Sequence, residues 1–408
     1  MTLQIDLADR AVRANPYPLY AKLRKEAPVL RTQVPAVGPA WILARYADVS
    51  EALKDPRLLN DRMRAQSKKS PLDRWWMPRI VRAFETSMVA QDDPNHRRLR
   101  NLVHMAFTPK MIEQLSARVT EITNNLLDNA EKRGSIDLLD AFALPLPLTI
   151  ISEMMGVPEK DRLPFRDMIA GMLNNTSALE GSFIGTARML PTMMRLTRFF
   201  QNLVKLRRAE PGDDLTSRLI QARAEGHAQL TEDEIAAMLF LLLFAGHETT
   251  VNLIGNGTLA LLENPGQLAL LREKPELIGS AVEELLRYSN PVEQPSPRWT
   301  SEEMTYQGVK IPKGEAIMSL IASANRDEDA FERADELDIT RNPNRHVAFG
   351  LGVHYCLGAP LARLEGKIAI LSLVQRFPKL RLAVPPETLK WRPTPSLHGL
   401  EALPVHLS

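Results

Sequence analysis

Residues 349–360 read FGLGVHYCLGAP and contain the only cysteine of this 408-residue chain. Pro360 suits the first turn of a helix, where its missing N–H costs nothing. Apolar residues follow it at helical spacing: Leu361, Leu364, Ile368 and Leu371. Cys356 is therefore predicted to lie at the start of a helix. A bound metal, or the partial positive charge of a helix N-terminus, favours the thiolate form of such a cysteine.

Glycines surround this cysteine and suit a tight loop. Gly358 would let a flat ligand approach the backbone without meeting a Cβ, and Phe349 would lie beside that ligand. A lone cysteine is more often a small buried hydrophobic residue, but the full pattern F-x-x-G-x-x-x-C-x-G favours a ligand site. This pattern resembles the signature of the haem-thiolate monooxygenases, the cytochrome P450 family. The resemblance implies that Cys356 is the axial ligand of the iron of haem b, iron protoporphyrin IX, where a thiolate favours O–O cleavage.

The composition is that of a globular protein, with 25% charged and 44% hydrophobic residues. Length alone would allow two or three domains, but no linker supports a division, so residues 1–408 are predicted to form one domain. The net charge of +2 argues against a general nucleic-acid binder. One cysteine excludes an internal disulfide framework and fits the reducing cytoplasm.

The sequence gives no sign of a membrane anchor. The first ten residues lack the apolar core of a signal peptide. The longest uncharged apolar run, residues 236–246, is much shorter than the roughly 20 residues of a membrane span, and we interpret it as the core of a buried helix. A cytoplasmic protein of the soluble bacterial branch of the family is therefore expected.

The predicted fold is mainly helical with a small β-rich lobe, and the resemblance implies a long central helix over the haem. Short strands are expected at residues 29–32, 41–45, 304–311 and 316–321. Helices are expected at residues 111–132, 136–155, 161–208 with a break at 174–185, and 275–288. The methionines of 161–208 suit a lid over an apolar pocket or plain core. Trp75 and Trp76 either belong to a loop over the substrate or pack a surface helix.

A second motif lies at residues 92–100, which read DDPNHRRLR. An acidic N-cap followed by a proline predicts a helix start, and the spacing of four places His96 and Arg100 on one face. Such cations are ordinarily solvated and repel mildly. The segment resembles the haem-clamping helix of the family, which implies that His96 and Arg100 pair with the haem propionates.

Residues 231–264 predict the longest helix, about 50 Å, beginning at a capping box formed by Thr231 and Glu234. At its centre, residues 245–250 read AGHETT and interrupt an apolar helix with polar groups. A mid-helix hydroxyl can bond back to a preceding carbonyl and leave a groove for O₂ and water. A satisfied polar patch at a helix crossing is the alternative. The resemblance implies that Glu248 and Thr249 deliver protons to bound O₂, and that Ala245 contacts the haem.

Three charged residues are expected to be structural. Glu284 and Arg287, three residues apart, share a helix face; such a pair alone is usually a surface salt bridge. The resemblance implies a buried group with Arg341 behind the haem. It also implies that Arg298 and His346 bind propionates, and that Gly350 and Gly358 line the haem with Phe349.

The resemblance implies a monooxygenase that activates O₂ and hydroxylates or epoxidises an apolar small-molecule substrate, such as a steroid, fatty acid, terpenoid or polyketide. The chain has no flavin or dinucleotide fingerprint and no cysteine set for an iron–sulfur cluster. Electrons from NAD(P)H must therefore come through a ferredoxin and ferredoxin reductase, or a flavodoxin-type donor. Two alternatives remain: a peroxide-driven peroxygenase, which would not need Glu248 and Thr249, and a non-enzymatic haem-thiolate sensor.

Overall fold

The computed structural model describes residues 9–34, 37–66, 87–107, 109–173, 183–222, 230–394 and 396–408. Trp75 and Trp76 lie outside the described residues, as does most of the expected break in the 161–208 helix. The α-helices before the central one are α1 Arg10–Ala14, α2 Tyr17–Glu26, α3 Tyr46–Ala52, α4 Arg62–Gln66, α6 Asn95–Ala106, α7 Pro109–Glu131, α8 Pro145–Met154, α9 Glu159–Leu173, α10 Phe183–Ala209 and α11 Leu215–Gln221. Those that follow are α12 Glu232–Glu263, α13 Pro265–Glu273, α14 Ile278–Tyr288, α15 Ile321–Ala324 and α16 Ala359–Arg376.

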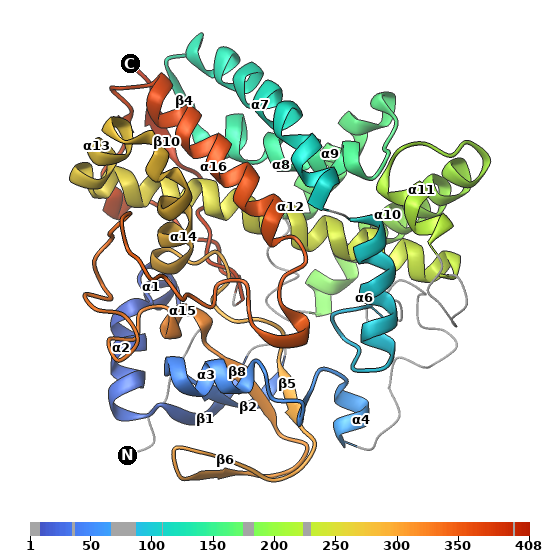
Figure 1. Cartoon of the computed structure of the whole chain (residues 1–408), viewed down its shortest axis with the longest axis vertical. Helices are drawn as coiled ribbons and strands as arrows, with labels where there is room; N and C mark the ends of the chain where they lie inside the picture. Colours follow the sequence, from blue (N-terminus) through green and yellow to red (C-terminus); the bar gives the residue numbers. More distant parts are fainter. Residues whose placement is uncertain are drawn as a thin grey trace.

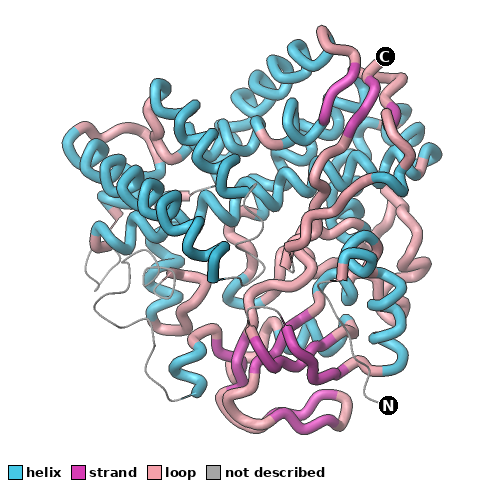
Figure 2. The backbone as a smooth tube through the Cα atoms, turned by 180° about the vertical axis from the view of Figure 1, so that it is seen from behind, coloured by secondary structure: helices cyan, strands magenta, loops and turns pink. Residues whose placement is uncertain are grey.

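In the part of the chain that the structure describes, the strands form one larger sheet and two small ones, and most gather at one end of the molecule (Figure 2). The five-stranded sheet has the order β1-β2-β8-β5-β3, with β1 Val29–Val34, β2 Gly38–Leu43, β3 Leu58–Leu59, β5 Arg298–Thr300 and β8 Ala316–Ser319. The others join β4 Ser135–Asp137, β10 Pro404–His406 and β9 Arg381–Leu382, and β6 Met304–Tyr306 with β7 Val309–Ile311. The predicted β-rich lobe is the larger sheet, in which β2 runs parallel to β8 with Ala40 opposite Ala316.

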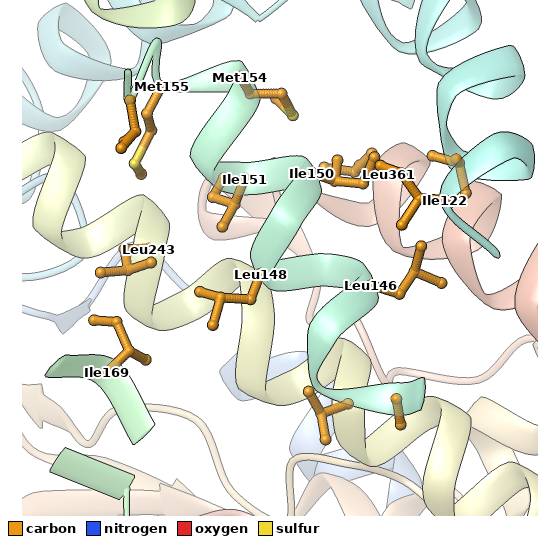
Figure 3. Close-up of a cluster of buried hydrophobic side chains, with 14 of the residues drawn as sticks. Ile122, Leu146, Leu148, Ile150, Ile151, Met154, Met155, Ile169, Leu243 and Leu361 are labelled. Carbon is orange, nitrogen blue, oxygen red and sulfur yellow. The ribbon is translucent and has the colours of Figure 1, made fainter. Parts of the chain in front are cut away.

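Helix α12 is the central element of the fold. Its capping box forms as predicted, with the Glu234 backbone N–H donating to Thr231 Oγ1 and the Thr231 N–H donating to the Glu234 carboxylate. With 32 residues it is about 48 Å long, and it packs against α8, α10, α14 and α16 as it crosses the molecule (Figure 1). Figure 3 shows Leu148 and Ile151 of α8 beside Leu243 of α12.

Part of this helix, Glu234–Glu263, is long and apolar enough to cross a membrane by length and composition, but 67% of its apolar window is buried in the protein. We therefore interpret it as a core helix, in agreement with the sequence-based expectation for residues 236–246.

Three local predictions differ from the structure because contacts distant in sequence decide them. Residues 136–155 are not one helix: Ile136 pairs with Val405 in β4–β10, and a π-helical turn, Leu139–Ala143, precedes α8. Residues 304–311 are a hairpin, in which Gln307 and Gly308 both have positive φ. The acidic N-cap before α6 is also absent, since the Asp92 carboxylate instead accepts the backbone N–H groups of residues 60 and 61.

Glu365 on α16 is a buried acid whose second carboxylate oxygen has no hydrogen-bond partner among the described residues. Burial raises its pKa from 4.5 to about 8. The folded state therefore holds this proton more tightly than the unfolded chain. Its contribution to stability is complete below about pH 4.5 and is lost as the pH rises through about 8.

We predict that Glu365→Gln, which mimics the protonated acid, makes the free energy of unfolding depend less on pH. In the wild type the contribution of Glu365 to this dependence has a slope of at most roughly 1.4 kcal/mol per pH unit. Denaturant unfolding at several pH values between about 5 and 9 measures the slope. The exposed Glu276→Gln is the matched control and should keep the wild-type slope. Equal slopes in Glu365→Gln and the wild type would contradict the assignment.

Candidate functional site

The cysteine loop leads into α16 as predicted, with Pro360 in the first turn. The Cys356 N–H donates to the Phe349 carbonyl at 2.9 Å, which closes the loop. Gly352 has φ of 72°, and a Cβ there would lie 2.9 Å from the Leu53 carbonyl oxygen. Only glycine therefore fits where the loop presses against the end of α3.

Cys356 is exposed to solvent in the described part of the chain. Burial raises the pKa of the Cys356 thiol, whereas the backbone N–H groups of Gly358 and Ala359, and the cations Arg100 and Arg363, act in the opposite direction. The start of α16 thus favours the thiolate as expected, but it does not overcome burial by itself. A metal ion at the sulfur would supply the remaining stabilisation of the thiolate.

Four basic side chains converge beside this loop. The rings of His96 and His354 lie with centroids 4.1 Å apart. Arg100 donates to the Tyr355 carbonyl at 2.7 Å, and Arg298 donates to the carbonyls of residues 52 and 53 at 3.1 and 3.0 Å. Burial, together with the charges of His96, Arg298 and Arg100, lowers the pKa of His354 to about 3. Burial and Arg100 also lower the pKa of His96.

This basic cluster, His96, Arg100, Arg298 and His354, is short of anions. Among the described residues, the one carboxylate within 4 Å of it is that of Asp93, 3.6 Å from His96 Nδ1, and Asp93 is also bound by Arg97 at 2.6 Å. The buried His96 Nε2 has no partner in the described part of the chain. Half-buried guanidinium groups favour a nearby anion, and a buried ring nitrogen without a partner is costly. The two propionates of a haem fit this cluster.

His346 does not lie in the basic cluster, although the resemblance implied that it binds a haem propionate. Its Nε2 lies 3.0 Å from Glu283 Oε2, and Arg363 binds the same carboxylate at 2.7 and 2.8 Å. Burial raises the pKa of Glu283, but hydrogen bonds from Arg363 and His346 outweigh it and hold the pKa at about 2. The Arg363 guanidinium stacks 4.5 Å from the Phe349 ring centroid. His354, two residues before the cysteine in the same motif, takes the place beside Arg298.

On α12, Ala245 is the one exposed residue between positions 235 and 261. Thr249 donates to its carbonyl at 2.8 Å, and Thr250 donates to the Gly246 carbonyl at 3.2 Å. The back-bonding expected from the sequence is present, but the helix is continuous from 232 to 263, so no break accompanies it. The exposure of Ala245, among buried and half-buried neighbours, shows that solvent reaches this turn of the helix.

The acid of this segment is largely buried. The Glu248 side chain is 12% exposed and lies 3.7 Å from Arg392 Nη1. Burial raises the pKa of Glu248, and Arg392 opposes the increase. His247 is fully buried with its Nδ1 on the Leu243 carbonyl, and burial lowers its pKa to about 4. Glu248 and Thr249 are therefore the groups of this turn suited to hold and move a proton, whereas His247 belongs to the core.

The predicted structural group forms as the sequence suggested. Glu284 accepts two hydrogen bonds of 2.8 Å from Arg287 and two of 3.1 and 3.2 Å from Arg341, and both Glu284 and Arg287 are fully buried. Asn344 and the Asp338 N–H also donate to this carboxylate. Arg287 donates in addition to three backbone carbonyls, those of residues 325, 334 and 336.

The comparisons with known proteins agree with this geometry. The Cytochrome P450 family model matches residues 10–400. "Polyketide biosynthesis cytochrome P450 PksS" of Bacillus subtilis is 43% identical over 397 residues, which cover 97% of this chain and 96% of that protein. "Vitamin D(3) 25-hydroxylase" of Pseudonocardia autotrophica is 43% identical over 404 residues, covering 99% and 96%.

Solved structures share the fold over nearly the whole chain. The structure of PksS has a TM-score of 0.89 at 41% identity and covers 99% of this chain and 100% of that one. P450BioI in complex with an acyl carrier protein has a TM-score of 0.87 at 36% identity, covering 98% and 99%. The predicted fold, mainly helical with a small β-rich lobe, is confirmed. The chain belongs to the cytochrome P450 family and is a monooxygenase of the oxidoreductase class.

Proposed function

We propose that this protein is a single-domain, cytoplasmic haem-thiolate monooxygenase that oxidises an apolar organic substrate with O₂. The observation that carries the proposal is the arrangement around the Cys356 loop. A cysteine that solvent reaches lies beside four basic groups that lack enough carboxylates, and α12 exposes one alanine in an otherwise buried stretch. A sulfur ligand, anion-binding groups and a solvent-accessible turn of α12 together match what a haem requires.

Each residue has a part in holding the prosthetic group. Cys356 would ligate the iron, and the basic cluster would bind the propionates, with His354 in the role that the resemblance implied for His346. Ala245, Phe349, Gly350 and Gly358 would border the ring. Bound haem would supply the site at which O₂ is reduced and from which one oxygen atom passes to the substrate.

Glu248 and Thr249 of α12 would control proton transfer. Burial raises the pKa of Glu248 and so makes this carboxyl easier to protonate than an ordinary glutamate, while the nearby Arg392 favours the carboxylate form. Thr249 has a hydroxyl that can rotate from the Ala245 carbonyl toward a ligand or water at this turn of the helix. We infer that Glu248 passes protons from solvent and that Thr249 orients their delivery.

The relatives narrow the substrate class. One relative's name places it in polyketide biosynthesis, another is a vitamin D₃ hydroxylase, and a third was solved with a fatty acid attached to an acyl carrier protein. These are large, largely apolar molecules. We propose a substrate of this class, with electrons from NAD(P)H supplied by a ferredoxin and its reductase or by a flavodoxin-type donor.

A turnover assay tests this function against its alternatives. Candidate substrates are first selected by the high-spin shift that they cause in the haem spectrum. Product should then form with NAD(P)H, reductase, ferredoxin and O₂. Product formed with peroxide alone would identify a peroxygenase. A haem-loaded protein that forms no product with either oxidant would support the sensor alternative.

We predict that Thr249→Ala keeps haem binding but diverts electrons from product to peroxide. Loss of a positioned proton-transfer group typically costs roughly 10²–10⁴-fold, so product per NAD(P)H should fall by about tenfold or more. Thr258→Ala is the matched control, because Thr258 makes the same back-bond to Ile254 on the same helix but lies in the core. Wild-type coupling in Thr249→Ala would show that other groups direct the protons.

A further inference from the structure

Helix α12 carries a polar stripe of which the predicted oxygen chemistry explains only Glu248. Glu248, Asn252 and Asn256 follow one another at intervals of four residues and therefore share one helix face. Asn252 and Asn256 are buried, as are their neighbours on the helix. Buried amides in an apolar helix are unfavourable unless a specific partner meets them.

All three residues meet one segment, the C-terminal hairpin, of which the structure describes residues 391–394 and 396–400. Asn256 Nδ2 donates to the His398 carbonyl at 2.8 Å. Asn252 packs on Gly399 so closely that a Cβ there would lie 2.2 Å from its Oδ1. Arg392 Nη1 lies 3.7 Å from Glu248 Oε1. The stripe thus aligns the hairpin along α12.

The hairpin itself holds the Arg392 side chain in place. Trp391 and Leu400 form a β-bridge, and the Arg392 N–H donates to the Gly399 carbonyl at 2.8 Å. Arg392 Nε donates to the Leu400 carbonyl at 3.1 Å, which fixes one edge of the guanidinium. Its Nη1 edge is the one turned to Glu248.

A second set of contacts anchors the hairpin from outside. The buried Arg13 donates to the carbonyls of Thr394 and Leu397 and pairs with Glu293. His398 stacks on Trp391 with ring centroids 3.9 Å apart. With α12 on one side and Arg13 and Glu293 on the other, Arg392 has little freedom to leave the acid.

The charges that face Glu248 are few. Arg392 is the one charged side chain of the described residues that acts on it, while the neighbouring His247 points into the core and Glu293 and His398 serve the far side of the hairpin. At 3.7 Å the ion pair is longer than a normal hydrogen bond. The cation therefore favours the carboxylate without occupying its lone pairs, and the Arg392 side chain is itself 18% exposed.

We propose that Arg392 is a positioning residue for proton delivery. The C-terminal hairpin, held in register on α12 by Asn252 and Asn256, places the Arg392 guanidinium beside Glu248. The guanidinium thereby sets the pH range in which Glu248 can take a proton from solvent and pass it on. The proposal rests on the proposed function of Glu248. Arg392 lies 144 positions from Glu248 in the sequence.

The test follows the protonation of Glu248 as well as turnover. The carbonyl absorption of a protonated carboxyl, assigned by its loss in Glu248→Gln, is titrated by infrared spectroscopy in the haem-loaded protein. In Arg392→Met this absorption should persist to higher pH than in the wild type, because burial is no longer opposed. The yield of product per NAD(P)H should also be measured against pH, and the acid limb of this profile should move to higher pH in Arg392→Met. Arg392→Lys should produce a smaller shift.

Matched variants separate this effect from a structural one. Lys390→Met removes an exposed cation two residues earlier and should change neither titration. In a Glu248→Gln background, Arg392→Met should produce no further shift of the profile. Should Arg392→Met fold poorly, Arg392→Gln decides by the same criteria.

Superimposable titrations of Arg392→Met and the wild type would overturn the proposal, as would an equal shift in the Glu248→Gln background. If instead the wild type forms no product under any electron supply, the proposed function fails, and the infrared titration still decides whether Arg392 controls Glu248.

Discussion

Glu284→Ala is expected to leave little folded, haem-loaded protein. Glu284 is fully buried and is the acceptor for Arg287, Arg341, Asn344 and the backbone of Asp338. Its removal strands a guanidinium, that of Arg287, with no exposure to water. Breaking such a pair costs about 3–5 kcal/mol, a large part of the roughly 5–15 kcal/mol that stabilises a typical domain.

Glu303→Ala provides the contrast, because Glu303 forms an exposed ion pair with Lys310 at 3.2 Å. Loss of that pair should cost less than about 1 kcal/mol. Denaturant unfolding and haem content per protein measure both variants. A Glu284→Ala protein with wild-type haem content and a stability change no larger than that of Glu303→Ala would contradict the structural role.

Cys356→Ser should abolish product formation while leaving the fold intact. The Cys356 residue is exposed and belongs to none of the hydrophobic clusters, so a hydroxyl there removes little packing. Loss of a residue that only hydrogen-bonds to a metal ligand lowers activity at metal sites by roughly 10–100-fold, and loss of the ligand itself should exceed this range.

Far-ultraviolet circular dichroism and unfolding midpoints verify the fold of Cys356→Ser, and product analysis with the full electron-transfer chain measures its activity. Retained product formation at more than about a tenth of the wild-type rate would argue that Cys356 does not serve the reaction.

Features set by neighbouring residues were predictable from the sequence. Thr231 and Glu234 are three residues apart and form the capping box on which α12 begins. Glu284 and Arg287 share a helix turn, and Pro360 lies in the first turn of α16. In each case a local spacing and one physical rule were sufficient.

Features that depend on distant partners were not predictable in this way. The local sequence predicts a helix at Ile136, but Ile136 pairs with Val405 in a strand. His346 and His354 both precede Cys356 within ten residues, and only the fold shows that Glu283 binds the first while the His96 ring lies beside the second. A signal was present, since His354 lies inside the cysteine motif. Arg392 has no sequence signal at all, because its partner Glu248 is 144 positions away.

The central claim is that Cys356 ligates a haem as a thiolate, and one spectrum tests it most directly. The reduced protein is exposed to carbon monoxide, and the Soret band is recorded for the wild type and for Cys356→His, which offers a neutral nitrogen ligand instead. We expect the red-shifted band of thiolate ligation in the wild type and its replacement by the ordinary band of nitrogen ligation in the variant. A red-shifted band that persists in Cys356→His, or none in haem-loaded wild type, would contradict it.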